Sequence, residues 1–420
     1  MKTIFDKNFW NEFIDVNENF NQACVIENAF NENFKNSLYQ GVTESFYNRV
    51  ENNNLINGFR LYNDKGELVK NQNTIEIFTK NPPKENEDII LYFERIIKTR
   101  FGIIMNFGEV FSELLGKNIF QALEPLYKLV GYPPLGNEIT IFIGNYGWTP
   151  LGIHKDHTGE NVLHFHLGPG RKQMYIWDDE TYEKLVGKNV INNKEIEPIL
   201  NYAKKFDFGE GDIFYMPWFV NHVGYTEDIS IGVSLWFHSS DIFSYSKKVI
   251  KHFLTQFIPN DTRIIPPQID YLNNHDTYEY FKKNILKTLN KENPNLNDFL
   301  MSIYLDFKYS LFSNGGWANC PPENKIESID YTYFEYKIIE LSKPFKIIYN
   351  NFNNEKLDIY IRGRKTRIKY FKDFENLLNK LNNDEKIVVN DFIETLSIPK
   401  EAFLYILLTL YKHRGIVIVE

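Results

Sequence analysis

The sequence predicts a mainly β core of the jelly-roll or barrel type, with helical regions before and after it. Between residues 138 and 238, short apolar stretches alternate with glycine and proline, which is typical of many short strands joined by tight turns. Apolar residues recur at helical spacing before the core, across 89–130, and after it, across 243–312. The 420 residues suffice for two or three domains.

The strands expected in the core are short and bounded by turn residues. They are Glu138–Gly144, Val162–Leu167, Gln173–Trp177, Asp212–Met216 and Ser230–His238. Ala23–Ile26 predicts one further short buried strand ahead of the core.

Four parts are expected along the chain. Residues 1–87 form a mixed region that packs on the core, 88–242 hold the core, 243–344 are helical, and 345–420 form a small separate unit. In the last part, strands are expected at 345–349 and 357–361, helices at 371–381, from 388 and at 399–412, and a final strand at 415–419. Two helices followed by a β element is a winged-helix order. Because the last helix is mostly apolar, a buried scaffold is favoured there over a DNA-binding helix.

The composition of the chain argues against nucleic-acid and membrane partners. Hydrophobic residues make up 43% of the chain, and the formal net charge of −8 is spread widely, which argues against nucleic acid. Two cysteines far apart in sequence suit a reducing compartment rather than a disulfide framework. The first residues lack an apolar signal-peptide core, and no apolar stretch approaches the ~20 residues of a membrane span. We therefore expect a cytoplasmic protein without a membrane partner.

Three residues predict a metal site. His154 and Asp156 lie two positions apart, so on an extended strand their side chains share a face. His222 follows a predicted strand and the turn at Pro217, which would return its side chain to the mouth of the barrel. Two imidazoles and one carboxylate form the facial ligand set of non-haem Fe(II), which leaves positions open for a co-substrate and O₂.

A dicarboxylate keto acid bound to such a metal needs a cation for its far carboxylate. Arg171 and Lys172 are adjacent on an incipient strand, so only one can point inward, and Lys172 is the preferred candidate. Thr149 and Tyr146 could add hydroxyl contacts, and Ser234 could lie near the metal-bound carboxylate.

Four more histidines crowd the same region. They are His157, His164, His166 and His238. His164 and His166 share a strand face, so a second metal is conceivable, but no carboxylate or cysteine at matching spacing supports it. Pocket lining or satisfied core histidines are favoured.

The motifs around these residues resemble those of the JmjC and cupin-type Fe(II)/2-oxoglutarate oxygenases, and most of all the ribosomal-oxygenase group. Residues 211–224 match the group's G-D-x-x-Y-x-P-x-x-x-x-H-x-G pattern, and residues 168–172 match G-x-G-R-[RK]. The resemblance implies a double-stranded β-helix over 88–242, a helical region at 243–344 that could dimerise, and a winged helix over 345–420. It assigns the far carboxylate of 2-oxoglutarate to Lys172. The spacing from His154 to Lys172 is longer than usual, with residues 157–160 as the insertion.

The resemblance implies an enzyme that uses Fe(II), 2-oxoglutarate and O₂ to hydroxylate a C–H bond of a side chain in a peptide or protein, releasing succinate and CO₂. The flanking regions favour a macromolecular substrate because they could form a long groove. Two alternatives remain open at this point. One is a small-molecule hydroxylase with the same chemistry, and the other is a non-catalytic cupin-like scaffold that binds a peptide.

Overall fold

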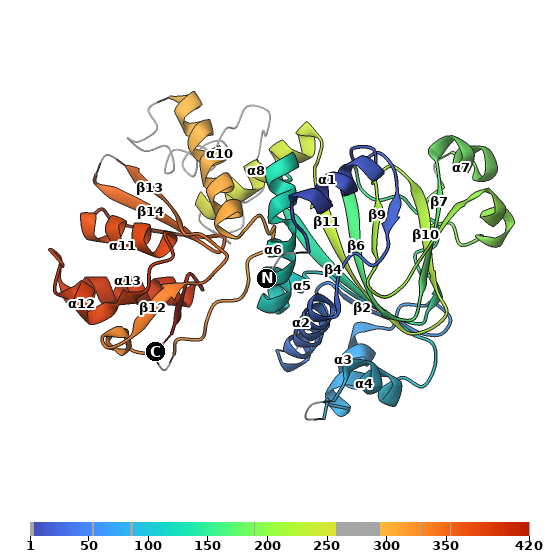
Figure 1. Ribbon diagram of the computed structural model, residues 1–420, viewed down its shortest axis with the longest axis horizontal. Coiled ribbons are helices and arrows are strands. Elements are labelled where there is room, and N and C mark those ends of the chain that lie inside the picture. The colour runs from blue at the N-terminus through green and yellow to red at the C-terminus, as the bar shows by residue number, and fades with distance from the viewer. Residues whose placement is uncertain are drawn as a thin grey trace, which may run out of the picture.

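The computed structural model describes residues 4–419 except 53, 85–86, 189, 258–294, 328 and 353. Its centre consists of antiparallel strands with helices packed around them (Figure 1), which confirms the predicted mixture of β core and α-helices. The large sheet has seven strands. In spatial order they are β1 (Cys24–Ile26), β9 (Ile213–Met216), β6 (Glu160–Pro169), β11 (Ser230–His238), β4 (Asn137–Gly144), β3 (Gly102–Met105) and β2 (Phe59–Tyr62).

A second, four-stranded sheet belongs to the same core. Its order is β5 (Gly147–Trp148), β10 (Asn221–Thr226), β7 (Lys172–Trp177) and β8 (Lys204–Phe208). Side chains of both sheets share one apolar cluster, in which Val162 and Phe214 of the large sheet meet Met174 and Phe208 of the small one. The two sheets therefore face each other, and the space between them is where inward side chains gather.

Side chains of the central strands alternate between two faces, as the pleat requires. Phe165 and Val233 belong to the main apolar core with the helices. Thr140, Ser234 and His164 stand opposite one another on three neighbouring strands and line the space between the sheets. This alternation separates a purely apolar outer face from an inner face that carries polar groups.

The outer face of the large sheet is covered by helices α1 (Lys7–Val16), α2 (Glu32–Glu51) and α6 (Glu113–Val130), seen in blue and teal in Figure 1. Side-chain oxygens of Asp6, Asn31 and Ser112 accept hydrogen bonds from free backbone N–H groups at the starts of these helices. Smaller helices complete this half of the chain. They are α3 (Asn71–Lys80), α4 (Ile89–Ile96), α5 (Gly108–Phe111), α7 (Asp179–Val186) and the 3₁₀ helix η1 (Glu197–Tyr202).

The prediction of helix across 89–130 is wrong at residues 102–105, which form a strand. Strand β3 interrupts it, and all four of its residues are buried between β2 and β4. A short apolar run buried on both faces has no alternation to distinguish it from a helix, so periodicity could not find it. All five predicted core strands and the strand at 24–26 are confirmed, whereas β10, which carries His222, was not expected.

The C-terminal part begins with α8 (Ile242–Phe257) and α10 (Leu296–Ser313) and continues into two small three-stranded sheets. Part of the helical prediction for 243–312 falls on 258–294, which lies outside the described residues. The remaining elements are η2 (Tyr331–Phe334), β12 (Ile338–Leu341), β13 (Ile348–Phe352), β14 (Lys356–Ile361), β15 (Arg364–Lys369), α11 (Lys372–Asn382), β16 (Ile387–Val388), α12 (Val389–Ile393), α13 (Lys400–Lys412) and β17 (Ile416–Ile418). This unit has its own apolar core, built around Leu377, Phe403 and Leu407. Across the described residues, no helix is both long enough and apolar enough to span a membrane.

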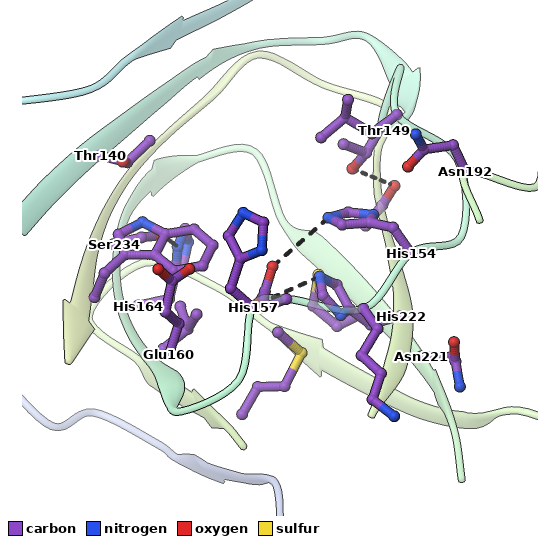
Figure 2. Close-up of a pocket in the computed structure, with 18 of the residues that line it drawn as sticks. Thr140, Thr149, His154, His157, Glu160, His164, Asn192, Asn221, His222 and Ser234 are labelled. Carbon is purple, nitrogen blue, oxygen red and sulfur yellow. Dashed lines mark hydrogen bonds and ion pairs between the residues drawn. The ribbon is translucent and has the colours of Figure 1, made fainter. Parts of the chain in front are cut away.

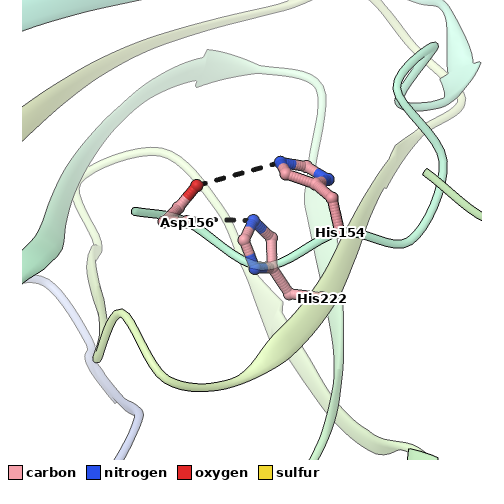
Figure 3. Close-up of side chains that lie close together, drawn as sticks. All are labelled: His154, Asp156 and His222. Carbon is pink, nitrogen blue, oxygen red and sulfur yellow. Dashed lines mark ion pairs between the residues drawn. The ribbon is translucent and has the colours of Figure 1, made fainter. Parts of the chain in front are cut away.

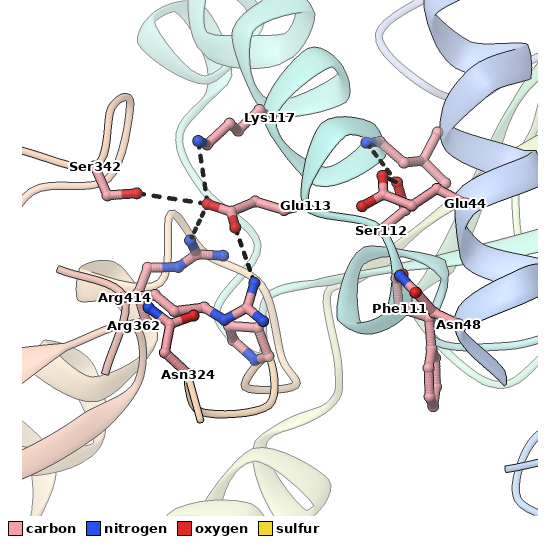
Figure 4. A network of polar contacts seen from close by, with 12 residues as sticks. Glu44, Asn48, Phe111, Ser112, Glu113, Lys117, Asn324, Ser342, Arg362 and Arg414 are labelled. Atoms are coloured by element: carbon pink, nitrogen blue, oxygen red, sulfur yellow. Dashed lines mark hydrogen bonds and ion pairs between the residues drawn. The ribbon is translucent and has the colours of Figure 1, made fainter. Parts of the chain in front are cut away.

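A polar network joins this unit to the β core (Figure 4). Glu113, the first residue of α6, accepts hydrogen bonds from Arg362 at 3.4 Å and from Arg414 at 2.9 Å. Lys117 lies 3.1 Å from the same carboxylate. Only 3% of Arg362 is exposed, and its guanidinium lies 3.7 Å from the centre of the Phe345 ring. One carboxylate thus bridges two arginines of the C-terminal unit.

Replacing Glu113 with alanine should lower the free energy of unfolding by about 3 kcal/mol, because Arg362 would stay buried without its anion. Chemical denaturation monitored by circular dichroism measures this change. Lys117→Ala is the control, since it removes only a partly exposed i,i+4 pair and should cost no more than about 0.5 kcal/mol. Equal losses in the two variants would contradict the role given to Arg362.

Candidate metal centre

Backbone pairing brings two distant histidines together. His154 N donates to the carbonyl of His222 at 3.1 Å, and His222 N donates to the carbonyl of His154 at 2.8 Å. Residues that exchange both bonds in an antiparallel pair present their side chains on the same face. The two imidazole centroids lie 4.4 Å apart.

Asp156 completes the group (Figure 3). Its Oδ1 lies 3.9 Å from His154 Nε2, and its Oδ2 lies 3.9 Å from His222 Nε2. One ligand atom from each of the three residues falls within 4.8 Å of the others. The structure therefore brings all three predicted ligands together.

The hydrogen bonds of the imidazoles fix which nitrogen faces the centre. His154 Nδ1 lies 2.9 Å from the carbonyl of Gly152, and His222 Nδ1 lies 3.3 Å from the carbonyl of Val220. A carbonyl only accepts, so each Nδ1 carries the proton and each Nε2 keeps its lone pair. Both lone pairs are then available to a metal ion, in the manner of histidine ligands held by an outer partner.

Burial disfavours the charged forms of all three side chains of the triad. Burial lowers the pKa of His154 and of His222 to about 4, so both imidazoles are neutral at pH 7. Burial also raises the pKa of Asp156 to about 7, and within the described part of the chain its Oδ2 has no hydrogen-bond partner. A divalent cation would supply the missing partner, so the donor set and its surroundings fit a metal of the iron type.

The triad opens into a cavity of about 860 Å³ between the two sheets (Figure 2). Lys172 lines this cavity and is only 6% exposed. Its Nζ lies 4.7 Å from the centre of the Phe142 ring, and no described carboxylate forms an ion pair with it. Its neighbour Arg171 points outward and binds Asp207 at 2.6 Å, so only one of the two adjacent cations enters the cavity.

Of the three other residues predicted to contact the co-substrate, two line the cavity and one does not. Thr149 lines the cavity, and its hydroxyl donates to the carbonyl of Gly224 at 3.0 Å. Ser234 also lines the cavity. Tyr146 does not: its ring packs over Gly102, and its centre lies 5.9 Å from Lys172 Nζ.

His164 and His166 form a buried chain with Ser234. His166 Nε2 donates to the carbonyl of Gly170 at 2.7 Å, and the Nδ1 of His166 lies 3.4 Å from His164 Nε2. Burial keeps the pKa of both imidazoles below the usual range, so both are neutral. His164 Nε2 must then donate to His166, and the Ser234 hydroxyl donates to His164 Nδ1 at 2.7 Å. Ser234 consequently offers lone pairs, and no proton, to the cavity.

The sequence did not single out three further cavity residues. Glu138, Thr140 and Phe142 of β4 all line the cavity. The strand itself was predicted. Because side chains alternate along a strand, knowing which face of β4 points inward would have identified these three residues. That assignment depends on strand pairing, which sequence alone does not give.

The apoprotein should bind one Co(II) per chain through the triad, and His222→Ala should weaken binding by more than about a hundredfold, as expected when one of three protein ligands is lost. The visible spectrum of Co(II) and calorimetric titration report this binding. His238→Ala is the matched control because His238 lines the same cavity outside the triad. Equal weakening in both variants would argue against the assigned ligands.

Metal binding should strengthen as pH rises from 6 to 8. The folded-state pKa of Asp156, about 7, exceeds its ordinary value of 3.8, so the apoprotein loses stability as pH rises from about 4 through 7. Metal ions need the carboxylate, so each pH unit below 7 should reduce apparent affinity about tenfold. Thermal unfolding with and without Co(II) should show a larger shift at pH 8 than at pH 6. His154 and His222 remain neutral across this range, so Asp156→Asn should flatten the dependence.

No family model and no curated protein sequence matches the chain. Among solved structures, it is similar to YcfD, described as a ribosomal oxygenase from Escherichia coli, at 13% identity and a TM-score of 0.49, with 95% of each chain covered. Complexes of the same protein with cobalt and succinic acid, and with cobalt and 2-oxoglutarate, match at 13% identity, a TM-score of 0.46 and 95% coverage of each chain.

Proposed function

We propose that this protein is an Fe(II)- and 2-oxoglutarate-dependent oxygenase that hydroxylates a carbon of a side chain in a peptide or protein. One observation carries the proposal. The converging ligand atoms of His154, Asp156 and His222 share a cavity with Lys172, a buried ammonium group that has no carboxylate partner among the described residues.

The triad would hold the metal through two Nε2 atoms and one carboxylate oxygen. When bound there, Fe(II) with 2-oxoglutarate and O₂ supplies the oxidising power for C–H hydroxylation, with succinate and CO₂ as products. The carbonyls of Gly152 and Val220 hold the two imidazoles in the required tautomer. The apolar side chains Met174, Phe208 and Phe214 line part of the cavity and would limit the access of water to the reacting carbon.

Lys172 would bind the far carboxylate of 2-oxoglutarate. An ammonium group that is buried without an anion is costly, and a ligand carboxylate would remove that cost. Gly224 leaves room for this side chain, because a Cβ at that position would lie 3.3 Å from Lys172 Cε and 2.9 Å from Thr149 Oγ1. Thr149, which lines the same wall, would border the co-substrate.

Two structural proposals accompany this function. The facing seven- and four-stranded antiparallel sheets support a double-stranded β-helix. The order α11, α12, α13 and β17 supports a winged-helix-like unit at 345–420. A substrate larger than a metabolite is supported by a second cavity that borders the first and reaches Asp241 at the start of the helical region.

Anaerobic addition of Fe(II) and 2-oxoglutarate should produce the visible charge-transfer band of a chelated 2-oxo acid. Lys172→Met should raise the 2-oxoglutarate concentration for half-maximal band intensity by about tenfold to a hundredfold. A loss of this size is expected when one charge-assisted hydrogen bond to the ligand is removed. Lys155→Met is the control, since Lys155 also borders the cavity but pairs with Asp179 at 2.5 Å. A band that is absent despite bound iron would refute the proposed function.

A further inference from the structure

A second cavity borders the one at the metal triad. Its volume is about 480 Å³, and it reaches Asp241 and Lys248 at the start of the helical region. Four residues line both cavities: Glu138, His157, Glu160 and His238. We call the two neighbouring cavities together the acidic groove. Figure 2 shows His157 and Glu160 at the same cavity as His154 and His222.

The second cavity is negatively charged. Glu138, Glu160 and Asp241 carry carboxylates, and Lys248 carries the one ammonium group among its lining residues. Glu160 is partly satisfied, because His238 Nδ1 lies 3.3 Å from its carboxylate. Glu138 is therefore the carboxylate that most needs a partner at the junction of the two cavities.

Two amide groups hold Glu138 in place without a direct ion pair. Asn106 Nδ2 donates to its Oε1 at 3.2 Å, and Asn319 Nδ2 donates to its Oε2 at 3.4 Å. Arg60 donates instead to the amide oxygen of Asn106 at 2.8 Å, so this amide lies between the two charges. Among the described residues, no cation forms an ion pair with Glu138.

Buried polar atoms without partners lie beside this carboxylate. Glu138 stands opposite Trp236 in the β4–β11 pair, and Thr140 is the next residue on the same face. Thr140 is 2% exposed, and within the described part of the chain neither its hydroxyl nor the indole N–H of Trp236 has a hydrogen-bond partner. Both residues line the cavity. Orphaned buried polar groups are rare, and a bound ligand would explain them.

We propose that Glu138, Thr140 and Trp236 form a subsite of the acidic groove for a cationic side chain of the substrate peptide, flanking the residue that is oxidised. This proposal rests on the proposed function and adds a rule of substrate choice to it. Glu138 supplies the charge, and the Thr140 hydroxyl and the Trp236 N–H pair with polar groups of the bound peptide. A lysine or arginine at a fixed distance from the target residue satisfies the carboxylate.

A second carboxyl lies beside Glu138. Asn319 Nδ2 donates to Glu109 at 3.2 Å as well as to Glu138. Burial raises the pKa of Glu109 to about 8, and the nearby charge of Glu138 adds to the rise, so Glu109 is mostly protonated at pH 7. Glu138 then carries the negative charge of the pair, which attracts a substrate cation and repels an acidic side chain.

The test is a selection of random dodecapeptides on the full chain loaded with Co(II) and 2-oxoglutarate. Wild type should enrich lysine or arginine at one fixed position, and Glu138→Gln should lose that enrichment. An enriched peptide should bind Glu138→Gln about tenfold more weakly than wild type. Its norleucine counterpart should bind both proteins equally, which a merely structural effect of the substitution would not produce.

Glu183→Gln is the matched control, because Glu183 lines the same cavity from α7 but is exposed and lies outside the proposed subsite. It should keep the enrichment of basic residues. The same enrichment in Glu138→Gln as in wild type, or none in wild type, would overturn the subsite. The Fe(II)–2-oxoglutarate band, measured on the same preparations, tests the proposed function separately: a normal band without basic enrichment leaves the oxygenase standing and refutes the subsite alone.

Discussion

The reciprocal backbone hydrogen bonds between His154 and His222 determine where everything in the site lies. A slip of one residue in this pairing would turn one imidazole to the opposite face and disperse the ligands. The segment is held on its other side as well, since Ile153 and Asn193 exchange both backbone bonds, at 2.7 and 3.0 Å. Gly152 makes that approach possible: it has φ +74°, and a Cβ there would lie 2.4 Å from the carbonyl oxygen of Asn193.

The inner face of the β core contains charged groups that the protein itself does not balance. Lys172 is buried beside the Phe142 ring, and Asp156 has a buried oxygen without a described partner. Each such group costs stability when it is isolated from water. Ligands of opposite charge, a cation at the triad and an anion at the lysine, would offset this cost. Burial of the apolar outer face against α1, α2 and α6 stabilises the fold and offsets the free-energy cost of these buried charged groups.

Residues of the C-terminal half contact the walls of the site. Strand β11 ends at His238, and helix α8 begins at Ile242, so the second cavity, which borders the cavity of the triad, reaches the helical region. Asn319 returns from that region to contact Glu138 and Glu109 inside the β core. Glu113 fixes the last unit through Arg362 and Arg414. The walls of the groove therefore depend on parts of the chain that are far apart in sequence.

Local patterns were enough for most of the core strands and for the choice of candidate metal ligands. Alternating apolar residues between turn signals predicted β4, β6, β7, β9 and β11, and helical spacing predicted α11 and α13. His154, Asp156 and His222 could be proposed as metal ligands because two imidazoles and one carboxylate match a facial ligand set and because the motifs around them support that choice. Strand β3 was missed because a strand buried on both faces carries no alternation.

What only the tertiary structure decided is which polar groups meet. The choice of Lys172 over Arg171, the place of Tyr146 outside the cavity, and the orphaned Thr140 hydroxyl all follow from the inner face of each strand. The pairing of β4 with β11 puts Glu138 opposite Trp236, and Asn319 reaches it from 181 positions away. The sequence determined most of the secondary structure and the candidate ligand types because these depend mainly on neighbouring residues. The groove and its charge depend on strand register and long-range packing, which no local pattern encodes.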